Sequence, residues 1–281
     1  MGPIAVRRWG SDGPQVALLH GGPGAAGDLA DLARALAPRF QVLEPLQRRS
    51  GETALTVARH VADLAEVLPG PMHVVGHSWG AMLGLSFAAA HPGLVTSLCL
   101  VGCGTYDAAT RAVYARRSQS RMTAAQRAEL AELQGGLASA RDRTARDALS
   151  WRAGQLFSAV YGVDLLPREP GDEPLWVDSG GEAETWPDVL RLQAEGVEPA
   201  AFSAIRAPVR MLHGDDDPHP GPMIRDLLAR HVADLSYLGF PRCGHDPWRE
   251  RHAREPFLRA LEEWLRRGSS RREDGTPLGV F

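Results

Sequence analysis

The pentapeptide GHSWG at residues 76–80 places a serine, Ser78, where a nucleophile could stand. An apolar run, residues 72–75, precedes it, and an Ala- and Leu-rich stretch, residues 81–90, follows it. This order predicts a strand, a sharp turn and a helix, with Ser78 at the tip of the turn. The flanking glycines would let the two backbones approach closely. The alternative is an ordinary turn in which Ser78 only caps the helix.

A serine nucleophile needs a base to take its proton and an acid to orient that base. His245 follows the last predicted strand, in GFPRCGHDPW, and Asp217 follows the strand before it, in GDDDP. Side chains at the carboxyl ends of parallel strands gather at one edge of a sheet. We therefore predict a triad of Ser78, Asp217 and His245, although His245 could instead cap the next helix. The competing acids are Asp107, Asp215 and Asp216.

Negative charge that develops on a substrate oxygen needs backbone N–H donors. The amide of Trp79, at the start of the predicted helix, is one candidate. The loop HGGPG at residues 20–24 follows an early strand, and the amide of Gly22 is the other candidate. We expect His20 to anchor this loop. A phosphate-binding loop is the alternative, but neither GxGxxG nor GxxxxGK occurs.

Short apolar strands alternate with amphipathic helices through most of the chain, which predicts an α/β fold with a parallel sheet covered on both faces. The alternation stops between residues 105 and 207, where helical patterns at 108–120, 124–135 and 141–161 precede a Pro-, Gly- and acid-rich passage. The expected strands cover residues 4–9, 16–19, 40–44, 72–75, 97–101, 209–212 and 235–238. The expected helices cover residues 28–37, 53–68, 79–90, 222–231 and 248–267.

We interpret residues 105–207 as a helical cap or lid on a core formed by residues 1–104 and 208–267, followed by a disordered tail, residues 268–281. Aromatic side chains of the cap could line an apolar substrate pocket, although each could equally pack the cap against the core. These cap aromatics are Trp151, Tyr161, Trp176 and Trp186.

Composition excludes several classes of function. The net charge of −3 gives no general attraction to nucleic acid or to anionic membranes, and no apolar run reaches the roughly 18 residues needed to span a bilayer. Without lysine, the chain cannot form a Schiff base. The N-terminus lacks a signal-peptide layout, so we expect a cytoplasmic location. Three cysteines without CxxC spacing indicate neither a disulfide framework nor a zinc site.

Together, HGGPG at 20–24, GHSWG at 76–80, GDDDP at 214–218 and CGHDPW at 243–248 resemble the α/β-hydrolase superfamily, and within it the prolyl iminopeptidase-like branch. The resemblance covers residues 4–104 and 208–267 and implies a mostly parallel, eight-stranded sheet, with the missing strand between Arg8 and Val16. Two features differ from that branch. The loop EPLQRRSGE is short, and the cap Trp-Glu pair that binds a substrate amine is matched only by Trp151-Arg152, which reverses the charge. The passage at 169–188, with seven acids and no base, is a replacement candidate.

The predicted function is a serine hydrolase that cleaves an ester, amide or lactone bond of a small molecule through an acyl-enzyme. This chemistry requires no metal and no cofactor, and the sequence does not indicate an oligomeric state. Because His245 must be neutral to act as a base, we expect activity to fall below about pH 6–7. The alternatives are an aminopeptidase releasing N-terminal proline, a ligand-binding protein without turnover, and a hydrolase of C–C bonds in diketones.

Overall fold

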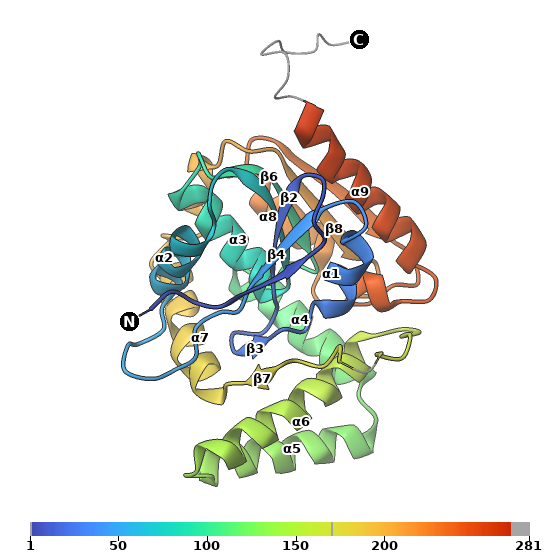
Figure 1. Ribbon diagram of the computed structural model, residues 1–281. Helices are drawn as coiled ribbons and strands as arrows, with labels where there is room; N and C mark the ends of the chain where they lie inside the picture. The colour runs from blue at the N-terminus through green and yellow to red at the C-terminus, as the bar shows by residue number, and fades with distance from the viewer. Residues whose placement is uncertain (1, 170, 271–281) are drawn as a thin grey trace.

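The computed structural model describes residues 2–169 and 171–270 of the chain. A seven-stranded sheet with the order β1-β4-β2-β5-β6-β8-β9 forms its centre (Figure 1). All neighbouring strands of this sheet are parallel except β1, which pairs antiparallel with β4 at the edge. The predicted α/β fold with a mostly parallel sheet is therefore confirmed. The strands are β1 (Val6–Trp9), β2 (Gln15–Leu19), β4 (Gln41–Pro45), β5 (Met72–His77), β6 (Val95–Val101), β8 (Val209–Gly214) and β9 (Leu235–Phe240).

The sheet has seven strands in the described part of the chain, not the expected eight. The additional strand was expected between Arg8 and Val16, but only a turn joins β1 to β2 there. Gly10 and Gly13 have positive φ angles of 71° and 88°, and a Cβ at either would lie within 2.4 Å of carbonyl oxygens that follow the first helix. The turn is therefore too short and too closely packed to hold a strand.

Helices cover both faces of the sheet, and each face has its own apolar cluster (Figure 1). One cluster joins the sheet to α2, α3 and α8, and the other joins it to α1 and α9. Helix α3 is buried on all sides, which explains why its sequence is apolar throughout rather than amphipathic. These helices are α1 (Ala30–Leu36), α2 (Val57–Val67), α3 (Trp79–Ala90), α8 (Gly221–Leu228) and α9 (Arg254–Ser270).

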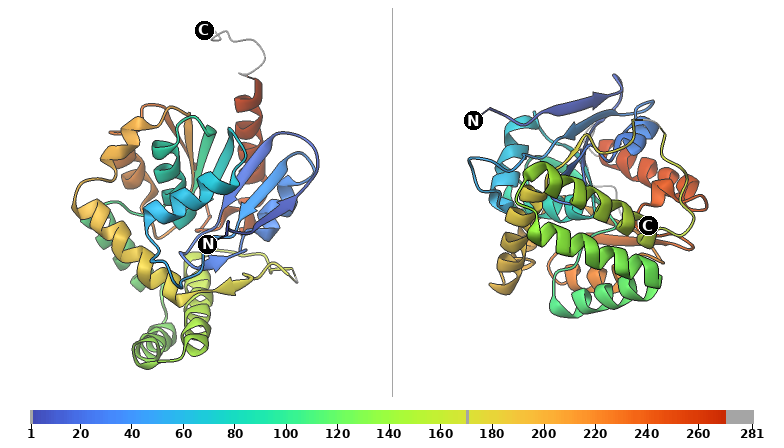
Figure 2. Two further views of the ribbon diagram at one scale, coloured as in Figure 1. Left: turned by 60° about the vertical axis from the view of Figure 1, so that its left-hand side comes forward. Right: turned by 90° about the horizontal axis from the view of Figure 1, so that it is seen from below.

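Between β6 and β8 lie most of the remaining helices, and two of them, α5 and α6, project beyond one end of the sheet (Figure 2). The three helices expected here are confirmed, each beginning after an Asp or Thr side chain that accepts from a backbone amide of the first turn. Their small shared core contains Met122, Leu133, Leu156 and Val160. The helices are α4 (Ala108–Arg121), α5 (Ala124–Ser139) and α6 (Arg143–Tyr161).

The acid-rich passage contains an unexpected helix, α7 (Ser179–Ala194), with Pro187 inside it. Acidic side chains of α7 accept hydrogen bonds from backbone amides at the start of α2, the helix on which α7 packs. Glu184 accepts a hydrogen bond from the amide of Leu55 at 2.9 Å, and Asp188 accepts one from the amide of Val57 at 2.9 Å. These carboxylates therefore serve the N-terminal end of α2, where free amides attract anions.

A two-stranded ribbon ties the insertion to the HGGPG loop. Strand β3 (Ala25–Ala26) directly follows this loop and pairs antiparallel with β7 (Trp176–Val177). The amide of Asp178 also donates to the carbonyl of Gly24 at 2.8 Å. Because of this pairing, the insertion and the loop that was expected to bind an oxyanion hold each other in place.

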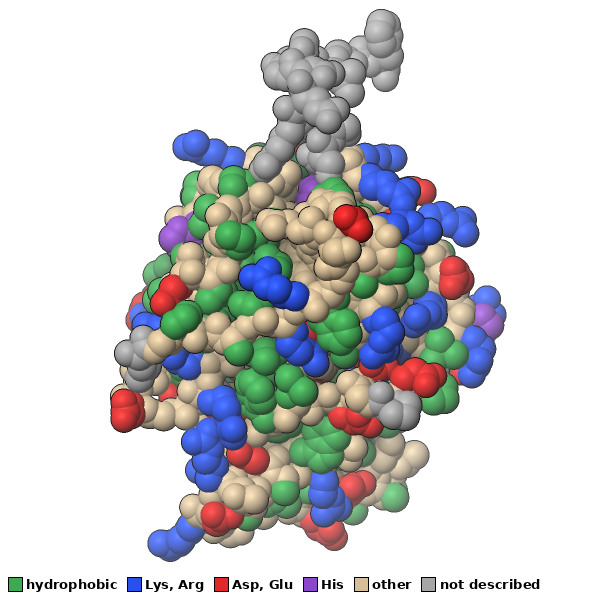
Figure 3. Space-filling view, viewed as in Figure 1, with side chains coloured by type: hydrophobic (Ala, Val, Ile, Leu, Met, Phe, Trp, Pro, Cys, Tyr) green, Lys and Arg blue, Asp and Glu red, His purple; other side chains and the backbone are tan. Residues whose placement is uncertain are grey.

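The C-terminal helix α9 continues to Ser270, beyond the point where the disordered tail was expected to begin. Residues 271–281 lie outside the described residues. Within 2–169 and 171–270, no helix has both the length and the apolar character that crossing a bilayer requires. On the face shown in Figure 3, arginine and acidic side chains are interspersed rather than gathered into areas of one sign.

Candidate active site

Ser78 stands at a strained turn between the most buried strand and the most buried helix. All six residues of β5 are buried, and α3 begins at the residue after Ser78. The backbone of Ser78 has φ 54° and ψ −117°, a left-handed conformation that costs a non-glycine residue on the order of 1–3 kcal/mol. Its amide donates to the carbonyl of Val101 at 2.9 Å. Such strain at a strand-to-helix turn is the geometry expected of a nucleophile elbow.

The glycines of the pentapeptide are required by close backbone contacts. A Cβ on Gly76 would lie 2.2 Å from the carbonyl oxygen of Gly80. A Cβ on Gly80 would lie 2.0 Å from the carbonyl oxygen of Leu19 in the neighbouring strand. Both distances are far below a van der Waals contact, so a side chain at either position would push helix and strand apart.

The structure brings together the side chains of Asp217 and His245, two members of the predicted triad. His245 Nδ1 lies 2.7 Å from Asp217 Oδ2, and both side chains are buried. Of the competing acids, Asp215 is exposed and Asp107 caps α4, so neither occupies this place. A Cβ on Gly214 would lie 2.1 Å from the carbonyl oxygen of Gly244, which shows how tightly the two loops pack.

The electrostatics of this pair favour an ionised acid and a basic imidazole. Burial opposes the charge on Asp217, but the imidazoles around it outweigh burial and hold its pKa well below the ordinary value. Burial likewise opposes a charged His245, but the charge and hydrogen bond of Asp217, together with Asp246, raise the pKa of His245 above that of an ordinary histidine. A neutral His245 therefore requires a higher pH than a solvent-exposed imidazole does.

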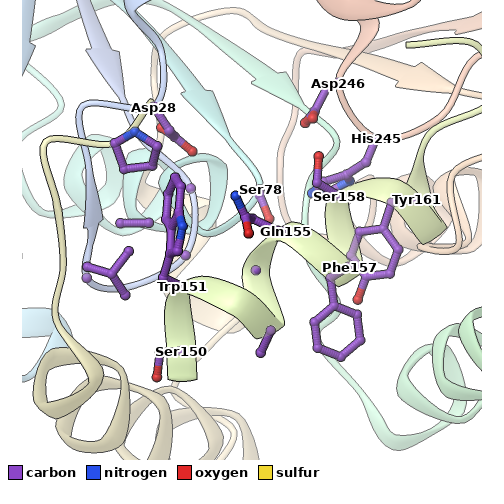
Figure 4. Close-up of a pocket in the computed structure, with 18 of the residues that line it drawn as sticks. Asp28, Ser78, Ser150, Trp151, Gln155, Phe157, Ser158, Tyr161, His245 and Asp246 are labelled. Carbon is purple, nitrogen blue, oxygen red and sulfur yellow. The ribbon is translucent and has the colours of Figure 1, made fainter. Parts of the chain in front are cut away.

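Ser78 and His245 line one cavity of about 730 Å³ (Figure 4). In this view Ser78 lies between Trp151 and Asp28 on one side and His245 and Tyr161 on the other. The hydrogen bonds of the described residues include none between Ser78 Oγ and His245. Such bonds are often long in unliganded enzymes and tighten when substrate binds. Asp217 is not in the cavity wall and lies behind His245.

The predicted oxyanion loop lies at the same cavity. Gly22 lines it, with a positive φ of 44°, and the carbonyl of Gly22 accepts from the amide of Ala25 at 2.9 Å. His20 is fully buried and, as expected, anchors the loop. Its Nε2 accepts from the amide of Gln47 at 3.2 Å, and burial lowers its pKa to about 4, so that it stays neutral. The side chain of Trp79 turns inward and donates to Gln47 Oε1 at 2.8 Å.

Two of the four cap aromatics line the cavity, and two do not. Trp151 and Tyr161, both on α6, are in its wall. Trp176 is not, because side chains alternate along a strand and its neighbour Val177 faces the cavity. The Arg49 guanidinium lies 5.8 Å from the Trp176 ring instead. Trp186, on α7, is 37% exposed and also lies outside the wall. The pocket role expected of Trp176 and Trp186 is therefore wrong.

Sequence analysis missed a buried acid that joins three loops. Glu250 is fully buried and accepts hydrogen bonds from the amides of Gly244, Val163 and Asp164 at 2.7–2.9 Å. It therefore fixes the loop of His245 to the segment that follows α6. A lone glutamate after CGHDPW carries no signal for this, because two of its three partners, the amides of Val163 and Asp164, are far away in sequence.

Asp28 is a second acid that sequence analysis missed. It lies in the cavity wall, and its Oδ1 is buried with no hydrogen-bond partner among the described residues. Burial raises its pKa well above the ordinary value, with the carboxylates nearby adding to the effect. The carboxyl group of Asp28 therefore keeps its proton to a higher pH than that of a solvent-exposed aspartate does.

His219 was also missed, and it lies against the acid and the base. In the described part of the chain, Asp217, His219 and His245 bring potential ligand atoms within 4.8 Å of one another. The Nδ1 atoms of both histidines lie at hydrogen-bond distance from the carboxylate, at 2.9 and 2.7 Å. We therefore read this group as a hydrogen-bonded cluster and not as a set of metal ligands.

Comparison with known proteins places the chain in a family. The model of the alpha/beta hydrolase family matches residues 16–260. The chain belongs to this family. It is 30% identical over 267 residues to a pimeloyl-[acyl-carrier protein] methyl ester esterase of Chromobacterium violaceum, which covers 90% of this chain and 94% of the relative. Membership of the family, with such a relative, makes the chain a hydrolase.

Solved structures of other alpha/beta hydrolases share the fold at low sequence identity. A thermophilic esterase from Thermogutta terrifontis superposes with a TM-score of 0.62 at 19% identity, covering 94% of this chain and 93% of the esterase. A proline iminopeptidase from Mycobacterium smegmatis gives 0.61 at 20% identity, covering 94% and 95%. Both likenesses support the α/β-hydrolase fold, and the iminopeptidase-like branch stays a prediction.

Proposed function

We propose that this alpha/beta hydrolase is a serine esterase that hydrolyses carboxylic esters of small molecules. The observation that carries the proposal is the positive φ of Ser78 in the wall of a cavity that His245 also lines, with Asp217 at 2.7 Å from His245. The esterase activity in the name of the Chromobacterium violaceum relative supports the ester as the bond that is cleaved.

In the proposed reaction, Ser78 Oγ attacks the ester carbonyl carbon while His245 Nε2 takes the hydroxyl proton. Asp217 holds Nδ1–H of His245 and balances the imidazolium charge. The amides of Gly22 and Trp79 receive the oxyanion, and the loss of one such donor typically costs about 3 kcal/mol in the barrier. His245 then gives its proton to the departing alkoxide. Water, deprotonated by His245, attacks the acyl-enzyme and releases the carboxylic acid, which restores Ser78.

The cavity indicates an acyl or alcohol group of moderate size with apolar character. A volume of about 730 Å³ lies within the range of small-molecule sites. We propose that the helices between β6 and β8 act as the predicted cap, because α6 supplies much of the apolar wall. The residues of this wall include Leu130, Leu137, Trp151, Phe157 and Tyr161.

The aminopeptidase alternative lacks its amine-binding cap pair. Arg152, at the position of the acid, is exposed and pairs with Glu129 at 3.4 Å, outside the cavity wall. Several acids of the 169–188 passage are already engaged. Arg34 pairs with Asp172 at 2.8 Å, and Arg143 pairs with Asp178 at 3.1 Å. We therefore place the ester ahead of the N-terminal proline amide.

The test uses a fluorophosphonate probe and two chromogenic substrates. We expect the wild type to be labelled and to hydrolyse p-nitrophenyl butyrate, and the Ser78→Ala variant to lose both while keeping its melting temperature. If the wild type hydrolyses proline p-nitroanilide but not p-nitrophenyl butyrate, the proposed esterase function is wrong and the aminopeptidase function takes its place. A folded wild type that takes no label would favour a ligand-binding protein without turnover.

A further inference from the structure

The buried carboxylate of Asp217 has one hydrogen-bonded imidazole on each oxygen, and a third imidazole nitrogen, Nε2 of His213, lies 3.4 Å from Oδ2. Oδ2 lies 2.7 Å from His245 Nδ1. Oδ1 lies 2.9 Å from His219 Nδ1 and also accepts from the His219 backbone amide at 2.9 Å. The Asp217 side chain has no exposed surface, so protein groups replace the water that would otherwise solvate its charge.

The ring of His219 is held against the ring of His245. Their centroids are 4.7 Å apart and their planes differ by 25°. The ring of His219 also stacks on Tyr114, with centroids 4.4 Å apart and planes 23° apart. The hydroxyl of Tyr114 in turn hydrogen-bonds that of Tyr161. Helices α4 and α6 of the insertion thus support the orientation of His219 from outside the sheet.

The protonation of both rings follows from their common acceptor. An ionised carboxylate only accepts hydrogen bonds, so Nδ1 of His219 and Nδ1 of His245 each carry a hydrogen. Burial lowers the pKa of His219, and the charge of Asp217 only partly offsets this. His219 is therefore a neutral donor at the pH where His245 works as a base.

We propose that His219 is a positioning residue, which holds the second oxygen of Asp217, fixes the plane of the carboxylate for His245 and divides its negative charge between two imidazoles. This inference rests on the proposed function, because His245 acts as a base only if the triad is catalytic. His219 itself does not touch the substrate or the reacting atoms, since it is absent from the cavity wall.

Because His219 also donates to the carboxylate of Asp217, the pKa of His245 is lower than it would be if His245 were the sole imidazole bound to that carboxylate. A donor on Oδ1 stabilises the negative charge, so less of that charge is available to stabilise a protonated His245. Removal of the donor therefore raises the pKa of His245 further. The titratable or charged groups that face the two rings come from several elements, and they are His213, Asp217, Arg117, Tyr114, Tyr161, His77, Asp246 and Asp28.

The first test compares His219→Phe, which keeps a flat ring without the donor, with His252→Phe, a histidine whose side chain is 43% exposed. In His219→Phe we expect the acid limb of the log kcat/KM profile to move up by about one pH unit. At the plateau we expect kcat to fall with KM nearly unchanged. His252→Phe should keep the wild-type profile. A folded His219→Phe variant with an unshifted limb would overturn the proposal.

The second test uses the wild type and does not depend on a variant that folds. In ¹⁵N-labelled protein with EDTA present, we expect two low-field imidazole Nδ1–H proton resonances, one for each oxygen of Asp217. A single such resonance would contradict the shared carboxylate. Two resonances in a protein that neither takes the fluorophosphonate label nor cleaves esters would instead reject the esterase, while leaving the arrangement around Asp217 standing.

Discussion

The sheet and the inserted helices differ in how much of each is buried. In α3, ten of twelve residues are buried, and in β5 all six are. In α5, by contrast, Leu133 is the one buried residue among sixteen, and α6 buries only two of nineteen. Dense packing of the core therefore fixes Ser78, Asp217 and His245 in place. Helices α5 and α6, which line the cavity, have few buried side chains to hold them rigid.

This difference separates two tasks of one active site. The proposed catalytic groups follow the carboxyl ends of β5, β8 and β9 in the packed core, so a small displacement there is costly. The groups proposed to contact the substrate lie mostly on helices with exposed surfaces, where we expect substitutions to change binding more than folding. Comparable substitutions should therefore have larger effects on activity and stability in the sheet core than in the inserted helices.

The largest effect is expected from Asp217→Asn in the core. The amide keeps the shape but loses the charge that stabilises a protonated His245, so we expect kcat to fall by about 10⁴-fold. Gln155→Leu, in the α6 wall, should change kcat/KM by less than about tenfold. Steady-state kinetics with p-nitrophenyl butyrate measure both, and equal losses would contradict the division of tasks.

A glycine substitution tests the packing of the two regions directly. A methyl group on Gly80 would meet the carbonyl of Leu19, so Gly80→Ala should lower the free energy of unfolding by about 3 kcal/mol. Gly135→Ala, in α5, meets no atom within 4 Å and should raise it by about 0.5–1 kcal/mol. Denaturant unfolding compares the pair, and a Gly80→Ala variant as stable as the wild type would refute the close approach.

The pH profile should reflect the pairing of His245 with Asp217, which outweighs the opposing effect of burial on the pKa of His245. Below its pKa His245 is protonated and cannot accept the proton of Ser78, and that pKa is raised above the ordinary 6.5. We therefore expect log kcat/KM to rise with pH and to level off only above this value, so that activity falls about tenfold per unit on the acid side. Initial rates from pH 5 to 9 measure it. A profile that is flat, or centred below 6.5, would exclude His245 as the base.

The smallest effect is expected from the aromatic side chains of the insertion. Trp151→Ala removes apolar surface from the cavity wall and should raise KM for longer acyl esters several-fold, by about 1 kcal/mol of binding. Trp186→Ala, outside the wall, should leave KM unchanged. A series of p-nitrophenyl esters from acetate to octanoate distinguishes them, and parallel changes in both variants would place Trp186 at the substrate.

Sequence patterns predicted the elements that the core positions, because each pattern reports burial directly. Apolar runs gave the strands of the parallel sheet, and the glycines around Ser78 gave the turn. The helix α7 was missed because its sequence contains Gly180, Gly181 and Pro187, which are unfavourable in helices. Its stability comes from packing on α2 and from acids that accept hydrogen bonds from amides there. Trp176 was misassigned because the sequence does not indicate which face of a two-residue strand meets the cavity.

From the sequence alone one could predict an α/β sheet with a serine, an acid and a base in a definite chain order at one edge. The periodicity of apolar residues and the position of each motif after a strand reflect local backbone geometry, which a sequence shows. The tertiary structure decided which partners each group has. His219 on the second oxygen of Asp217, Glu250 between three loops and Asp28 at the cavity are contacts between segments distant in sequence or within an irregular loop. Their physical basis is burial, which removes water and obliges each polar group to find a protein partner, and burial is a property of the whole fold.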